Sequence, residues 1–119
     1  QESRWLGDVY KRQAVEHVII HHVDTANVND PVLEMRSIYY FHAITRGWGD
    51  IAYNYLVDFM GNVYEGRVGG ENAVGCHAEG YNYGSAGICL MGRFFENDIT
   101  PEMHNAITWI ASWLSLIHI

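Results

Sequence analysis

The sequence predicts an α/β domain in which a mixed central β-sheet is flanked by helices. Short runs rich in β-branched and aromatic residues alternate with two longer segments whose apolar residues recur at helical spacing. Two of the short runs are separated by a tight turn and therefore predict a hairpin. This combination of a hairpin with strand–helix alternation indicates a mixed sheet with helices packed against it.

Residues 17–23, His-Val-Ile-Ile-His-His-Val, predict the first strand. The run is short and dominated by β-branched residues, as in strands buried within a sheet. It contains His21 and His22 near its end, and neighbouring side chains on a strand point to opposite faces, so only one can face a given site. Such a histidine is either a metal ligand on a rigid scaffold or a hydrogen-bonded structural residue.

A helix is predicted near residues 31–46. Asn29 or Asp30 is suited to cap it and Pro31 to occupy its first turn, and the glycines of segment 47–49 end it. Positions at the spacing i, i+3, i+4, i+7 predict its core face, which comprises Met35, Ile38, Tyr39 and His42. On such a face, His42 is interpreted as a core histidine.

The hairpin is predicted from strands near 52–59 and 62–66. Strand alternation places Tyr53 and Tyr55 on one face and Asn54 on the other. Tyr53 is either a half-buried sheet tyrosine or a phenol that points into a cleft as a hydrogen-bond donor.

A glycine-rich loop follows the hairpin and carries the dipeptide Cys76-His77. The loop contains no phosphate-binding signature. Adjacent residues usually diverge, so Cys76 and His77 do not form a nucleophile–base pair, and His77 is interpreted as a group lining a cleft. A last strand is predicted near 86–92 and a last helix near 101–115, whose core face comprises Met103, Ile107, Ile110 and Leu114.

Composition excludes several classes of protein. The 119 residues suffice for one domain, and 14 acidic against 7 basic residues give a net charge of -7. Without a basic cluster, we expect no nucleic-acid partner. No apolar stretch is long enough to predict a membrane span. The two cysteines do not constitute a disulfide framework.

Both ends resemble translated sequencing-adapter read-through, namely residues 8–13 and 114–119. We therefore expect residues 1–13 to be a non-native or linker segment and 14–119 to be the domain. On this interpretation the native gene continues past about Trp113.

Five segments, in order and at matching spacing, resemble the peptidoglycan-recognition protein and type 2 N-acetylmuramoyl-L-alanine amidase family. They include Val-Ile-Ile-His-His at 18–22 and Val-Gly-Cys-His-Ala-Glu-Gly-Tyr-Asn at 74–82. The others are 40–42 with 46–56, 58–67 and 85–88. Such a combination is far more specific than any of its motifs alone.

The resemblance implies a zinc amidase that cleaves the amide between the lactyl group of N-acetylmuramic acid and L-alanine of peptidoglycan. His21 matches the zinc ligand, and Tyr53 matches a tyrosine that stabilises the transition state beside the metal. The implied substrate-binding residues are His77, Arg67, Tyr81 and Asn82. A surface salt bridge is an equally good interpretation of Arg67. We expect His21, Tyr53 and His77 to face one concavity and His22 to point away.

In that family two further zinc ligands follow the last helix, so the resemblance also implies a fold that is incomplete at the C-terminus and a fragment that is inactive. The substrate implies an extracellular or cell-envelope protein. The paired cysteines that animal recognition proteins carry after the first strand are missing, and Val68-Gly69-Gly70 stands where a Gly-Trp pair often follows the hairpin. Stem-peptide preference and oligomeric state are therefore left open, and a non-catalytic peptidoglycan-binding module is the alternative function.

Overall fold

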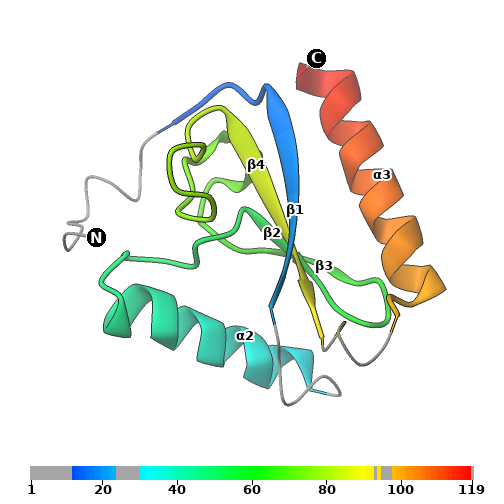
Figure 1. Ribbon diagram of the computed structural model, residues 1–119, viewed down its shortest axis with the longest axis horizontal. Helices are drawn as coiled ribbons and strands as arrows, with labels where there is room; N and C mark the ends of the chain where they lie inside the picture. Colours follow the sequence, from blue (N-terminus) through cyan, green and yellow to red (C-terminus); the bar gives the residue numbers. More distant parts are fainter. Residues whose placement is uncertain (1–11, 24–29, 93, 95–97, 119) are drawn as a thin grey trace.

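The fold is built on a four-stranded mixed sheet (Figure 1) with the strand order β1-β4-β2-β3. β1 (His17–Val23) and β2 (Tyr55–Val57) both pair in parallel with the central strand β4 (Ser85–Met91). β3 (Val63–Glu65) pairs antiparallel with β2 and completes the hairpin. The mixed sheet predicted from the sequence is confirmed. The computed structural model describes residues 12–23, 30–92, 94 and 98–118.

The first helix, α2 (Pro31–Tyr39), continues directly into a π-helical segment, Tyr40–Thr45. Asp30 caps α2, because its carboxylate accepts a hydrogen bond from the Leu33 N–H at 3.2 Å. The alternative cap, Asn29, lies outside the described residues. Tyr39 was expected in the core but is 46% exposed. The helix widens immediately after it, so that His42 and not Tyr39 continues the buried face.

The second long helix, α3 (Pro101–His118), begins where Thr100 caps it, since the hydroxyl accepts a hydrogen bond from the Met103 N–H. A single-turn 3-10 helix, Gly70–Asn72, lies in the glycine-rich loop. None of the helices in the described ranges has the length and apolar character that crossing a membrane requires.

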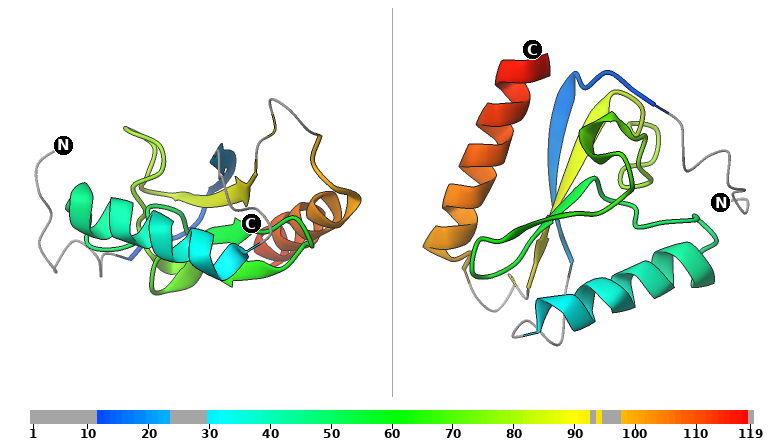
Figure 2. Two further views of the ribbon diagram at one scale, coloured as in Figure 1. Left: turned by 90° about the horizontal axis from the view of Figure 1, so that it is seen from below. Right: turned by 180° about the vertical axis from the view of Figure 1, so that it is seen from behind.

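The sheet lies between α2 and α3 (Figure 2), and every residue of β4 is buried. Alternate side chains of β4 serve the two faces: Ile88 packs on the α3 side, whereas Cys89 packs on the α2 side. Three of the four predicted core positions of α3 are buried on the α3 side, and Ile107 packs against them while partly buried. The core on that side contains Val15, Val57, Ala86, Ile88, Leu90, Met103, Ile110 and Leu114.

β2 is shorter than the predicted strand 52–59, and this changes where its tyrosines point. Tyr55 packs with the core on the α3 side, whereas Tyr53 packs on the α2 side. The prediction that they share a face is wrong, because strand alternation fails where the ladder is irregular. There the Asn54 N–H donates to the Gly87 carbonyl, whereas the Gly87 N–H donates to the side-chain oxygen of Asn54 and not to a backbone carbonyl.

Both end segments contribute residues to the fold. Gln13 was assigned to the segment before the domain, yet it is buried and its side chain bonds the Glu71 and Ser85 carbonyls and the Gly84 N–H. At the other end, Leu114 is fully buried in the core on the α3 side. The described fold therefore includes Gln13.

Candidate functional site

His21 lies on the face of β1 that looks toward α2. It is the cross-strand partner of Cys89, which places both side chains on this face. His22 points to the other face, where its ring meets Phe94 edge-on at 6.0 Å between centroids. Strand alternation thus separates the two histidines as predicted.

His77 reaches His21 from the glycine-rich loop. Its Nδ1 lies 2.9 Å from His21 Nε2, and the ring centroids are 5.0 Å apart. The imidazole rests where two glycines leave space, since a Cβ on Gly75 or Gly87 would come within 2.7 Å of the ring. Loop and strand therefore fit together only with glycine beneath this histidine.

Tyr53 completes the group, with its ring centroid 5.5 Å from that of His21. Burial, followed by the neighbouring Cys89 thiol as a smaller cause, raises the pKa of the phenol above its ordinary value. Tyr53 therefore stays protonated near neutral pH and is a hydrogen-bond donor. The structure brings His21, Tyr53 and His77 together from three separate segments.

His42 stands behind Tyr53, at 5.6 Å between ring centroids. It is buried, and its Nδ1 accepts a hydrogen bond of 3.1 Å from the Ala52 N–H. Burial, with the charges of Arg67 and Arg46 as smaller causes, lowers the pKa of His42 to about 4. The interpretation of His42 as a satisfied core histidine is confirmed.

The neutral state of His42 predicts acid sensitivity of the fold. Since the unfolded chain protonates this imidazole near pH 6.5 and the folded chain only near 4, its contribution to stability is complete above pH 6.5 and is lost as pH falls toward 4. The full loss is roughly 2–3 kcal/mol. We expect His42→Asn, which keeps an acceptor for the Ala52 N–H, to reduce the pH slope of the unfolding free energy by about one proton.

Urea denaturation at several pH values across this window measures the slope. The exposed His104→Asn, which removes a histidine from the surface of α3, serves as the matched control variant. Equal slopes for wild type and His42→Asn would contradict the assignment of His42 as a neutral core residue.

Arg67 requires a correction, because it is neither a substrate-facing residue nor half of a surface salt bridge. Only 1% of it is exposed, and its guanidinium donates hydrogen bonds to the carbonyls of Trp48, Asp50 and Ile51. It also contacts the Cys76 sulfur at 3.6 Å. Arg67 therefore links the end of the hairpin to residues 48–51 by hydrogen bonds. Its side chain is inaccessible to a ligand in this structure.

Tyr81 and Asn82 lie in the loop that follows His77. The Asn82 side chain accepts a hydrogen bond from the Ala78 N–H at 2.7 Å, so it stabilises the loop. Tyr81 is 72% exposed and borders a cavity of about 630 Å³ beside the start of β1. The cavity is lined by Glu16, His17, Val18, Ile19, Gly80, Tyr81, Tyr83, Gly84 and Ser85.

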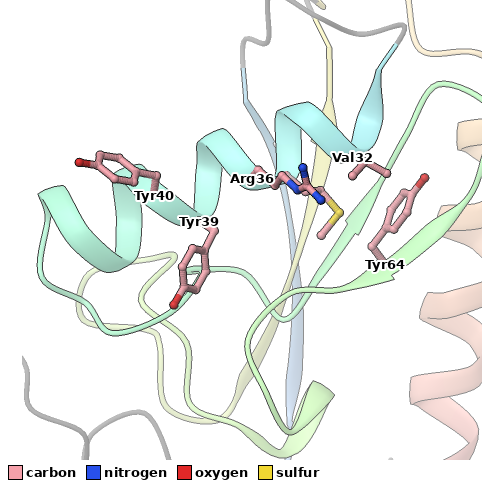
Figure 3. Close-up of a pocket in the computed structure, with 6 residues that line it drawn as sticks. Val32, Arg36, Tyr39, Tyr40 and Tyr64 are labelled. Atoms are coloured by element: carbon pink, nitrogen blue, oxygen red, sulfur yellow. The ribbon is translucent and has the colours of Figure 1, made fainter.

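A separate, mostly apolar hollow of about 320 Å³ lies along α2 (Figure 3). Tyr64 of β3 faces it across from the helix. The residues that line it are Val32, Met35, Arg36, Tyr39, Tyr40 and Tyr64, and they include none of the predicted site residues.

The described residues around His21 do not by themselves make up the ligand set of a zinc site. Two imidazole nitrogens converge there, whereas catalytic zinc takes three protein ligands. Among the described residues, no group of three His, Cys, Asp or Glu side chains could hold a metal ion. Burial, and then the neighbouring His22, lowers the pKa of His21, which favours the neutral form that a metal requires.

Sequence reasoning missed two residues that contact the site. Ser85 places its hydroxyl 3.2 Å from His77 Nε2, and Cys89 belongs to the cluster against which Tyr53 packs. The position of Cys89 could have been found from the sequence, because parallel pairing of the two predicted buried strands aligns it with His21. Ser85 had none, since its contact depends on the path of the loop between His77 and β4.

Comparison with known proteins adds independent information. Residues 11–118 match the family described as N-acetylmuramoyl-L-alanine amidase. Peptidoglycan-recognition protein LE of Drosophila melanogaster is 42% identical over 94 residues, which are 76% of this chain and 27% of that protein. The chain spans between about a quarter and just over half of the length of the first curated relatives it matches.

Solved structures agree with the sequence matches. The structure of bumblebee PGRP-SA superposes with a TM-score of 0.76 at 37% identity, covering 83% of this chain and 60% of that one. Peptidoglycan recognition protein-LE, solved in complex with tracheal cytotoxin, gives a TM-score of 0.74 at 37% identity, covering 85% and 60%. With a family match over nearly its whole length and the same fold, this chain belongs to the N-acetylmuramoyl-L-alanine amidase family, as a peptidoglycan-recognition-type member.

Proposed function

We propose that this chain is part of a zinc-dependent N-acetylmuramoyl-L-alanine amidase, which hydrolyses the amide between the lactyl group of N-acetylmuramic acid and L-alanine. The observation that carries the proposal is the convergence of His21, Tyr53 and His77. A strand, the segment before β2 and the glycine-rich loop place these side chains within 5.0–5.5 Å of His21 between ring centroids. If His21, Tyr53 and His77 had only structural roles, nothing would require their side chains to lie together at one place.

In this proposal the protonation state of each side chain suits its role. His21 is the metal ligand of this segment and is held neutral by burial. Tyr53 is a protonated phenol suited to donate to an oxyanion. Bound zinc with a full ligand set would polarise the scissile carbonyl and activate water. The substrate would contact His77 and the exposed ring of Tyr81. Asn82 would contribute by stabilising the loop that carries them.

The proposed ligand is peptidoglycan or a muropeptide. The solved complex of protein LE contains tracheal cytotoxin, which its title describes as monomeric diaminopimelic acid-type peptidoglycan. The similarity of this chain to that protein supports the same class of ligand here. Peptidoglycan lies outside the cytoplasmic membrane, so we place the protein in the extracellular space or cell envelope.

A non-catalytic peptidoglycan-binding module is the second candidate. It is favoured by the names of the relatives, which are recognition proteins, and by the lack of three clustered metal ligands among the described residues. Both candidates bind muropeptide, and they differ in whether free stem peptide is released.

The test uses the product of the complete gene, loaded with zinc and incubated with muropeptide. We expect free stem peptide, and we expect Tyr53→Phe to lower kcat about a hundredfold with little change in KM, because the donor acts in the transition state. Tyr39→Phe, which removes an exposed hydroxyl on α2, is the matched control. Muropeptide binding without any peptide release by the wild-type protein would establish the binding module instead.

A further inference from the structure

The hydroxyl of Ser85 is buried beneath His77, and its hydrogen bonds fix where its proton lies. Ser85 Oγ is 2.5 Å from the Tyr81 carbonyl oxygen and 3.2 Å from His77 Nε2. A carbonyl only accepts, and two oxygens cannot approach so closely without a proton between them. The single hydroxyl proton is therefore donated to Tyr81, and Ser85 Oγ offers His77 a lone pair.

His77 must consequently carry its proton on Nε2. A hydroxyl that has donated its proton elsewhere can only accept from this nitrogen. In the neutral imidazole the other nitrogen, Nδ1, is then an acceptor.

This assignment determines the hydrogen bond to His21. The His77 Nδ1 lone pair faces His21 Nε2 at 2.9 Å, so the proton between them belongs to His21. Neutral His21 then has its proton on Nε2 and an unprotonated Nδ1. A metal ion needs an unprotonated nitrogen, and Nδ1 is the one that remains.

Close packing around His77 leaves its imidazole ring little freedom to adopt another orientation. A Cβ on Gly87 would lie 2.5 Å from His77 Cγ, and one on Gly75 would lie 2.7 Å from Cδ2, so the ring rests directly against both backbones. The Ala78 N–H to Asn82 bond closes the loop behind it. The ring is thus held by packing as well as by hydrogen bonds.

We propose that Ser85 and His77 are positioning residues, which hold His21 as the Nε2–H tautomer and leave its Nδ1 as the nitrogen that binds the metal. This goes beyond the substrate-binding role expected of His77, and only its metal-binding part rests on the proposed function. The hydrogen-bonded chain runs from the Tyr81 carbonyl through Ser85 and His77 to His21.

The first test is made on the metal-free 119-residue chain and needs no variant. Histidine-ring 15N NMR at slightly alkaline pH identifies which nitrogens carry protons, and a coupling between two nitrogens across a hydrogen bond identifies the pair. We expect a 15N–15N coupling between His21 Nε2 and His77 Nδ1, with the proton on His21. A proton on His77 Nδ1, or no coupling, would overturn the proposal.

The second test measures zinc affinity in the complete gene product by competition with a chelator. His77→Leu should weaken zinc binding about tenfold to a hundredfold, as losses around a metal ligand do. His77→Asn, whose side-chain oxygen replaces the Nδ1 acceptor, should restore most of the affinity. Equal affinities for His77→Leu and wild type, with both folded by circular dichroism, would count against a positioning role.

These measurements separate the inference from the proposed function. A complete protein that shows the predicted coupling and zinc affinities but releases no stem peptide would refute the amidase and leave the positioning chain standing. An active amidase without the coupling would refute the positioning chain alone.

Discussion

The 119-residue chain is expected to bind zinc weakly and to release no stem peptide from muropeptide. Within the described residues only His21 and His77 bring ring nitrogens together, and no group of three possible ligands exists there. Structural zinc sites bind with roughly 10–16 kcal/mol, or about 3 kcal/mol for each ligand, so every missing ligand weakens binding about a hundredfold or more. Without a fixed third ligand, geometry and water activation are lost together.

Equilibrium zinc titration with a competing chelator, combined with muropeptide digestion, measures both properties. His21→Ala should remove the residual binding, whereas the control His104→Ala, on the exposed side of α3, should leave it intact. Under the proposed function, a protein that adds the further ligands to this segment should bind zinc stoichiometrically and release stem peptide. Tight, stoichiometric zinc with peptide release from the 119-residue chain would show that the assigned site is wrong.

Replacing Arg67 should destabilise the fold more than any change at the surface. Arg67→Ala leaves the carbonyls of Trp48, Asp50 and Ile51 without this donor and opens a cavity at a position that is 1% exposed. Each buried polar group left unsatisfied costs about 1–3 kcal/mol, so we expect a total loss of roughly 3–5 kcal/mol.

Urea denaturation monitored by circular dichroism gives the change in unfolding free energy. Arg36→Ala is the matched control, because Arg36 is exposed on α2, and its effect should stay within about 0.5 kcal/mol. Arg67→Lys should recover only part of the loss, since one ammonium cannot reproduce the planar fork of donors. A cost for Arg67→Ala as small as that of Arg36→Ala would contradict a structural role.

Most elements of the fold could be predicted because each has a strong local signal. The β-branched run of β1 and the cap at Asp30 lie where the sequence indicated, and α3 begins at Pro101 as expected. β2 was predicted too long, because the Asn54 side chain replaces a backbone partner of β4 there. A side chain that competes for a ladder bond leaves no trace in hydrophobic periodicity.

The sequence by itself selected His21, Tyr53 and His77 as candidate site residues, although it did not select Ser85 and Cys89. Strand alternation separates His21 from His22 with no knowledge of the rest of the fold, and the resemblance of the surrounding segments to the family selected Tyr53 and His77. These are local properties, carried by a residue and its near neighbours along the chain.

Only the tertiary structure decided what the selected residues do. Arg67 is a buried tie and not a ligand contact, because the carbonyls it bonds lie 16 to 19 positions away along the chain. The tautomer of His21 likewise depends on Ser85, which acts through His77 and lies 64 positions away by residue number. Burial and proton positions are set by which groups meet in space, and that is fixed only when the loop between His77 and β4 closes over the sheet.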